Sequence, residues 1–162
     1  MLVRTGLVVV AMAFASHVAL AQDTKGTIAA LDARLAKIGE AKVEGTDKAG
    51  DATVPALFFG ARKINNNYDV VDEIKKSSGA TATVFVKNGD EFTRVSTNVL
   101  TPEGKRGVGT NLARAKAYEG LSKGEQFCGQ VDVLGTAFDA CYNPIKDKGG
   151  KVIGATYIGF KK

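Results

Sequence analysis

The chain has 162 residues, of which 44% are apolar and 24% charged, a size and composition that favour a single globular domain. Its formal net charge is +5, with basic residues interleaved among acidic ones. No basic run with aromatic residues between its charges occurs, so we expect no nucleic-acid partner. The mildly basic surface instead favours anionic ligands.

Residues 1–21 have the features of a signal peptide. Arg4 precedes the apolar run GLVVVAMAFASHVALA, and the tripeptide Ala-Leu-Ala that ends at residue 21 fits a signal-peptidase site. We therefore expect residues 22–162 to form the mature domain, in the periplasm or secreted. The alternative is an uncleaved membrane anchor, because a run of about 17 residues can span a bilayer. With cleavage, the mature protein has no membrane-spanning segment.

The only histidine, His17, lies in this expected leader. A mature chain without histidine has no Ser-His-Asp or Cys-His catalytic site, no histidine-ligated zinc and no phosphohistidine relay. No pair of acidic residues fits general acid and base chemistry. We therefore expect a protein that is not an enzyme and that carries no metal and no cofactor.

The first half of the mature chain predicts two helices. An apolar stripe at spacings of three and four predicts a helix over residues 25–43 and consists of Ile28, Leu31, Leu35 and Ile38. The stretch EGTDKAGDATVP is rich in turn formers and breaks this helix. The second helix is expected to start at Asp69, as its cap, and to stop at Gly79.

The second half predicts strands in hairpin-like succession. Asn88-Gly89 is a strong hairpin signal, and a short helix is expected over residues 112–124. The expected strands alternate or are rich in β-branched residues and cover 81–87, 92–100, 125–133, 136–146 and 151–160. Helices that precede an antiparallel sheet indicate the α+β class.

The two cysteines, Cys128 and Cys141, lie in the hairpin around Leu134-Gly135. A two-residue loop there makes them face each other at a non-hydrogen-bonded position, where Cα atoms are roughly 4.5 Å apart. We expect a disulfide, which an exported protein favours and which contributes about 3 kcal/mol to stability. This register places the cysteines on the outer face and the apolar residues Phe127, Val131, Phe138 and Tyr142 on the inner face.

Four ordered segments carry a resemblance to a known family: YDVVDEIKKSSGATATVFV, FTRVSTNVLTPEGKRGVGT, AYEGLSKGEQFCGQVDVLG and FDACYNPIKDKGGKVIGATYIGF. They resemble the single Cache sensor domains of the Cache 3/Cache 2 fusion type. The resemblance implies a PAS-like fold, in which a long N-terminal helix packs on a five- or six-stranded antiparallel sheet. It also implies binding of a small molecule, often a carboxylate, outside the membrane.

Residues that match family positions are candidates for the ligand site. Arg94 offers a planar fork of donors for a carboxylate, and Thr97 offers a supporting hydroxyl. Because these two differ by an odd number, either a bulge re-aims one of them or only one enters the pocket. The other candidates are Tyr142, Phe59, Tyr68, Arg106 and Lys146. Core packing is the favoured role for Tyr142 and solvated charge for Arg106 and Lys146, whereas core packing explains Phe59 and Tyr68 as well as a ligand role does. Phe59 and Tyr68 are expected as lid residues, and the alternative for Arg94 is a solvated strand arginine.

The sequence is compatible with two functions. The first is an extracytoplasmic module that binds a small anionic metabolite without a signalling output of its own, coupled to a membrane receptor, a sensor kinase or a transporter. It predicts a pocket with converging polar donors. The second is a ligand-free structural or interaction module of the same fold. It predicts a filled pocket together with an exposed apolar patch or sheet edge for a protein partner.

Overall fold

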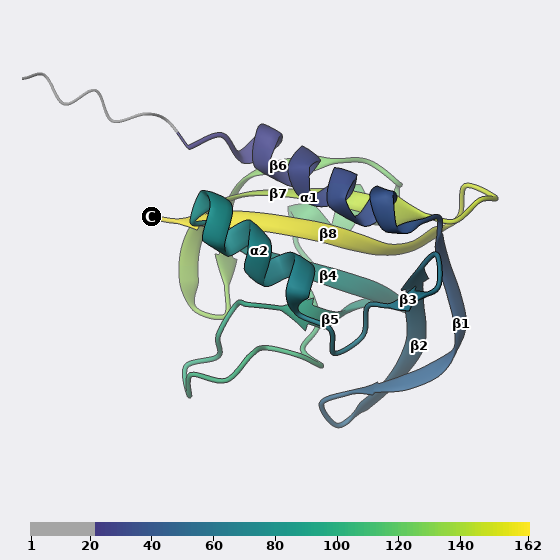
Figure 1. Ribbon diagram of the computed structural model, residues 1–162. Coiled ribbons are helices and arrows are strands. Elements are labelled where there is room, and N and C mark those ends of the chain that lie inside the picture. Colours follow the sequence, from purple (N-terminus) through teal and green to yellow (C-terminus); the bar gives the residue numbers. More distant parts are fainter. Residues whose placement is uncertain (1–21) are drawn as a thin grey trace, which may run out of the picture.

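A five-stranded antiparallel sheet lies at the centre of the computed structural model, which describes residues 22–162 (Figure 1). The three helices are α1 (Thr24–Ile38), α2 (Asp69–Ser78) and α3 (Lys116–Ser122). The central sheet has the order β5-β4-β8-β7-β6 and consists of β4 (Thr81–Asn88), β5 (Glu91–Thr97), β6 (Phe127–Val133), β7 (Thr136–Lys146) and β8 (Val152–Lys161). The expected α+β class is confirmed, whereas the expected leader and His17 lie outside the described residues.

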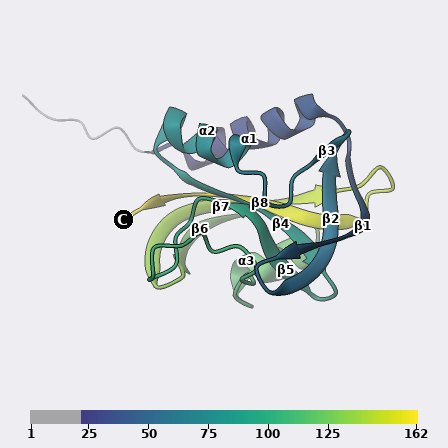
Figure 2. The same ribbon diagram turned by 60° about the horizontal axis from the view of Figure 1, so that its bottom comes forward.

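The sheet is covered on both faces, as Figure 2 shows, with α1 and α2 on one side and α3 on the other. Each face has its own apolar cluster. The first contains Leu31 and Ile74 of the two long helices together with Val84 of β4. The second contains Leu121 of α3 together with Phe85, the next residue of β4. Successive residues of one strand therefore enter different halves of the core.

The apolar stripe predicted for α1 is confirmed, since Ile28, Leu31 and Leu35 are buried. The helix begins after Asp23, whose side chain accepts a hydrogen bond from the backbone N–H of Gly26 at 2.8 Å. It ends at Ile38, five residues before the expected end. The chain packs so tightly after Ile38 that a Cβ on Gly39 would lie 2.5 Å from the Cα of Gly60.

Residues 44–55, which were expected to break the first helix, contain no helix, but they form a β-hairpin that was not predicted. β1 (Ala41–Ala49) pairs with β2 (Ala52–Phe59), and β3 (Arg62–Lys63) completes a second, three-stranded sheet. β1 is polar and mostly exposed along its length. Its side chains therefore lack the alternation that marks a strand, and only its pairing with the apolar β2 places it in a sheet.

The start of α2 differs from the prediction by one residue. Tyr68 occupies the cap position without a side-chain hydrogen bond, and Asp69 is the first helical residue. The side chain of Asn67 accepts a hydrogen bond from the backbone N–H of Asp69 at 3.1 Å, as a cap would. The predicted end is confirmed, because Gly79 adopts the left-handed conformation with φ of 79°.

The predicted hairpin register is confirmed: Cys128 pairs with Cys141, and the strands close at Val133 and Thr136. The two cysteines form a disulfide with a Cα–Cα distance of 4.1 Å, which agrees with a non-hydrogen-bonded pair. Their assignment to an outer face is wrong. Cys141 is fully buried in the cluster under α1 and α2, because both faces of this sheet are covered.

Candidate functional site

A β-bulge in β5 brings Arg94 and Thr97 onto the same face of the central sheet. The register shifts between the pairs Val84–Ser96 and Phe85–Arg94, so β5 has one extra residue there. In a regular strand, two residues three positions apart would point to opposite faces. Of the two alternatives predicted from the sequence, the one in which a bulge turns both side chains to one face is therefore confirmed. The shared face is the one that α3 covers.

Arg94 is buried, with only 3% of its surface exposed, so its interpretation as a solvated strand arginine is wrong. Its Nη1 donates hydrogen bonds of 3.0 Å to Oγ1 of Thr110 and to the backbone oxygen of Asn111. The guanidinium stacks on the ring of Phe85 at 5.0 Å from the ring centroid. Thr110 is half-buried and Asn111 is exposed, so the residues that hold Arg94 lie close to the protein surface.

The positive charge of Arg94 has no carboxylate partner within residues 22–162. Its Nε is also buried without a hydrogen-bond partner in this part of the chain. Burial lowers the pKa of Arg94, and the nearby hydroxyls of Tyr142 and Tyr157 oppose this shift only in part. A buried charge without a counter-ion costs several kcal/mol. An anionic group next to Arg94 would offset this cost.

Two buried tyrosines, Tyr142 and Tyr157, lie near enough to Arg94 to influence its pKa. The rings of Tyr142 and Tyr157 lie 4.9 Å apart between centroids, and the hydroxyl of Tyr157 is 3.1 Å from Oγ1 of Thr81. Burial raises the pKa of Tyr157 to about 12 and raises that of Tyr142 as well. Both phenols are therefore protonated near neutral pH. The hydroxyls of Thr83 and Thr97 lie 2.6 Å apart on the same face.

A comparison with protein families identifies the chain. The model of the Cache 3/Cache 2 fusion domain matches residues 5–162. The chain belongs to this family. Cache domains are extracytoplasmic sensory modules that bind small molecules, generally in sensor receptors, and they are not catalytic. A comparison with curated proteins found no match.

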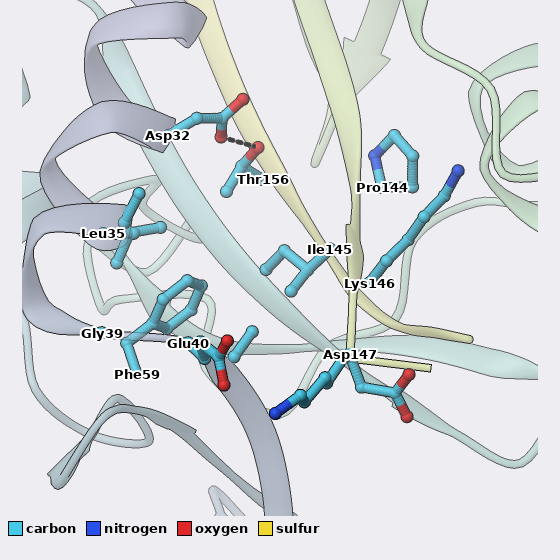
Figure 3. Close-up of a pocket in the computed structure, with 13 residues that line it drawn as sticks. Asp32, Leu35, Gly39, Glu40, Phe59, Pro144, Ile145, Lys146, Asp147 and Thr156 are labelled. Carbon is cyan, nitrogen blue, oxygen red and sulfur yellow. Dashed lines mark hydrogen bonds between the residues drawn. The ribbon is translucent and has the colours of Figure 1, made fainter. Parts of the chain in front are cut away.

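Two of the expected ligand residues of this Cache domain lie away from Arg94, in a cleft on the α1 side of the sheet. Phe59 and Lys146 line this cleft, which has a volume of about 610 Å³ and lies between the end of α1 and the β7–β8 turn (Figure 3). Phe59 is buried and Lys146 is exposed. The structure therefore does not bring these two residues together with Arg94.

Tyr68 and Arg106 form a third location, at the start of α2. The guanidinium of Arg106 lies 4.3 Å from the ring centroid of Tyr68. It donates two hydrogen bonds of 2.8 Å to the carboxylate of Asp72 and one of 2.9 Å to the backbone oxygen of Thr97. Through these hydrogen bonds, Arg106 links the segment that follows β5 to α2. Its charge is already paired, which distinguishes it from Arg94.

Several residues around Arg94 were missed from sequence. Tyr157 lies in the mostly apolar run of β8, which predicts a strand without distinguishing its two faces. Thr110 and Asn111 lie outside the named strands, although Asn111 forms an isolated bridge with Thr93 along the outer edge of β5. The described residues contain no group of three or more side chains suited to a metal ion. Within residues 22–162, no helix has the length and apolarity needed to cross a membrane.

Proposed function

We propose that this Cache domain binds a small anionic molecule, most simply a carboxylate, on the α3 side of its central sheet. The observation that carries the proposal is the buried guanidinium of Arg94, which has no acidic partner among residues 22–162. Its Nη1 donates hydrogen bonds to Thr110 and Asn111, whereas its Nε forms no hydrogen bond with any residue of that range. A carboxylate can accept hydrogen bonds side-on from Nε and the adjacent Nη2 of an arginine.

The binding energy of such a ligand would depend strongly on its charge. Forming or breaking a desolvated, hydrogen-bonded charge pair changes the binding free energy by about 2–5 kcal/mol. This range corresponds to an affinity difference of roughly 30-fold to several thousand-fold. A carboxylate should therefore bind much more tightly than its own amide, which has the same shape and no charge. The phenol group of Tyr142 supplies a neutral donor near the charge. The Tyr157 hydroxyl donates its proton to Oγ1 of Thr81, which itself donates to the backbone oxygen of Gly159.

Access to Arg94 requires movement of the chain that covers it. Thr110 and Asn111 form the layer next to its Nη1, and Leu112 packs in the same cluster as α3. We expect the segment 107–112 to move outward when a ligand enters. Such a segment, between a strand and a helix and near the surface, is the kind of element that opens most easily.

A second function is favoured by two other observations. The hydrogen bonds from Arg94 to Thr110 and Asn111 also fit a purely structural arginine that anchors the segment 107–112. Leu100 and Val43 are the large apolar side chains that remain exposed in the described chain, at 54% and 41%. A ligand-free interaction module would use such exposed apolar residues for a protein partner.

A thermal-shift screen on the oxidised protein tests the proposal. The probes are small carboxylates, each paired with its amide, and the proteins are the wild type, Arg94→Lys and Arg94→Gln. A ligand at a hundred times its Kd adds about 2.7 kcal/mol, which for this size raises Tm by roughly 10 °C. We expect carboxylates to raise Tm in the wild type and to lose this effect in Arg94→Gln.

The exposed Arg62 of β3 provides the matched control, because Arg62→Gln removes an equal charge at a position far from β5 in the chain. Carboxylate binding should survive this change. A flat screen on protein that unfolds cooperatively would refute the proposal and favour the interaction module, to be followed by a pull-down from the same compartment.

The cellular setting is part of the same proposal. We infer that residues 1–21 act as a signal peptide and that the domain functions in the periplasm or outside the cell. Its output would then come from a receptor, sensor kinase or transporter that recognises the loaded domain. Mass spectrometry of the exported protein tests this inference, since a mature chain that begins at Gln22 is expected and an intact residue 1–21 segment would contradict it.

A further inference from the structure

The cleft on the α1 side has the size and walls of a ligand site in its own right. Its volume of about 610 Å³ lies within the range of roughly 300–1,000 Å³ that small-molecule sites occupy. Leu35, Phe59 and Ile145 are its main apolar walls, and they belong to the cluster on the helix-covered face. Arg94 packs against Phe85 in the other cluster. The cleft is therefore separated from the Arg94 site by the sheet itself.

A carboxylate without a cation lines this cleft. Asp32 of α1 accepts a hydrogen bond of 2.6 Å from Oγ1 of Thr156 (Figure 3). It accepts another from the side-chain amide of Asn143. Both donors are neutral, and Asp32 forms no ion pair within residues 22–162. A carboxylate offers about four acceptor positions. Two of those of Asp32 therefore remain for a ligand.

The other charges at the cleft do not neutralise Asp32. Glu40 is exposed on the opposite rim, and Asp147 accepts hydrogen bonds from the backbone of its own turn. Lys146 points away from Asp32 and Phe59 in Figure 3. Its Nζ lies close to Gly124, since a Cβ added to that glycine would be 3.4 Å from it. Lys148 is the remaining cation of the lining and lies at the turn. The lining of the cleft therefore contains three acidic residues and two lysines, and Asp32 forms an ion pair with neither lysine.

We propose that this cleft is a second binding site, which takes a primary amine on an apolar body, with the ammonium group at Asp32 and the body between Leu35, Phe59 and Ile145. An ammonium has three N–H donors and matches the two acceptor positions that remain on Asp32. Burial of this carboxylate beside neutral donors makes a positive ligand group more favourable than a polar neutral one. The proposal is independent of the anion site, because it uses other residues on the other face of the sheet.

Calorimetric titration with 2-phenylethylamine and with hexylamine tests the proposal, and the alcohols 2-phenylethanol and hexanol serve as uncharged controls. We expect both amines to bind at least about tenfold more tightly than the matching alcohols. Asp32→Asn should weaken amine binding at least about tenfold and leave the alcohols unchanged. A lost charge-assisted hydrogen bond has an effect of this size. Failure of both amines to bind, or equal binding of the alcohols, would overturn the proposal.

A second pair of variants keeps the test valid if Asp32→Asn impairs folding. Ala36 is exposed on α1 and lines the cleft, whereas Ala33 is exposed on the same helix and does not line it. Ala36→Leu should fill part of the cleft and weaken amine binding, and Ala33→Leu should not. Equal effects of these two variants would refute the assignment. Loss of amine binding in Arg94→Gln with full binding in Asp32→Asn would place the amine in the other site and also overturn it.

Discussion

Loss of the Cys128–Cys141 disulfide should lower the free energy of unfolding by about 3 kcal/mol. The bond links the neighbouring strands β6 and β7 and closes a loop whose ends are 13 residues apart. A cross-link of this length removes roughly 10 cal/mol/K of chain entropy from the unfolded state, which is about 3 kcal/mol at 25 °C. For a domain of about 140 residues, Tm should fall by roughly 10 °C.

Urea unfolding followed by circular dichroism measures this effect on three samples: oxidised protein, protein reduced while unfolded and then refolded with reductant, and the Cys128→Ala/Cys141→Ala variant. Alanine is preferred to serine because Cys141 is fully buried and a hydroxyl there would have no partner. The reduced protein and the double variant should lose similar free energy. A loss under about 1 kcal/mol in both would refute the chain-entropy reasoning.

Three further predictions concern other elements. Asp72→Asn should lower stability by only about 0.5–1 kcal/mol in urea unfolding, because its pair with Arg106 is solvent-exposed; a loss above about 3 kcal/mol would contradict this view. Burial raises the pKa of Asp32 above 3.8, so the folded state binds this proton more tightly than the unfolded state does. The free energy of unfolding should therefore fall as pH rises from 3.8 through the raised pKa. This fall should be absent in Asp32→Asn, and the same dependence of stability on pH in the variant and the wild type would refute the prediction. Gly109→Ala should lower stability by at least about 1 kcal/mol, because its φ is 85° and a Cβ would lie 2.3 Å from the oxygen of Ala49; an unchanged Tm would contradict it.

The C-terminal hairpins could be predicted because local signals and pairing agree there. The turn residues Leu134 and Gly135 both have positive φ, at 50° and 84°, as a two-residue hairpin turn requires. The alternation on both sides of this turn then determines the register, and the predicted pairing of Cys128 with Cys141 followed from it. The sequence could not show whether the second face of this hairpin is exposed, because the alternation of residues is the same whether that face meets water or a helix.

The β1–β2 hairpin could not be predicted because its signal is tertiary. Residues of β1 are mostly exposed and polar, and the Gly and Asp residues of this stretch are also typical of turns. β1 further contains a register shift between Val43 and Thr46. Only the buried residues of β2, such as Leu57, mark the region as a sheet.

The candidate site was predicted in part. The sequence pointed to Arg94 and Thr97 as candidates but did not show whether a bulge places them on the same face. The register between β4 and β5 shows that it does. Asp32 does not belong to the apolar stripe of its helix, yet it reaches Thr156 on β8, 124 positions away. A contact of that range depends on how α1 crosses the sheet, which no local pattern specifies.

The central claim, that Arg94 receives the negative charge of a small ligand, is tested most directly by the NMR resonance of its Nε–H. Nε is buried and has no partner within the described chain, so this resonance can be followed in a ¹H–¹⁵N spectrum and assigned by its absence in Arg94→Lys. Titration with a carboxylate that raises Tm should move this resonance downfield and saturably, while the Arg62 resonance stays unchanged. Saturable binding of the carboxylate with an unmoved Arg94 resonance would contradict the account.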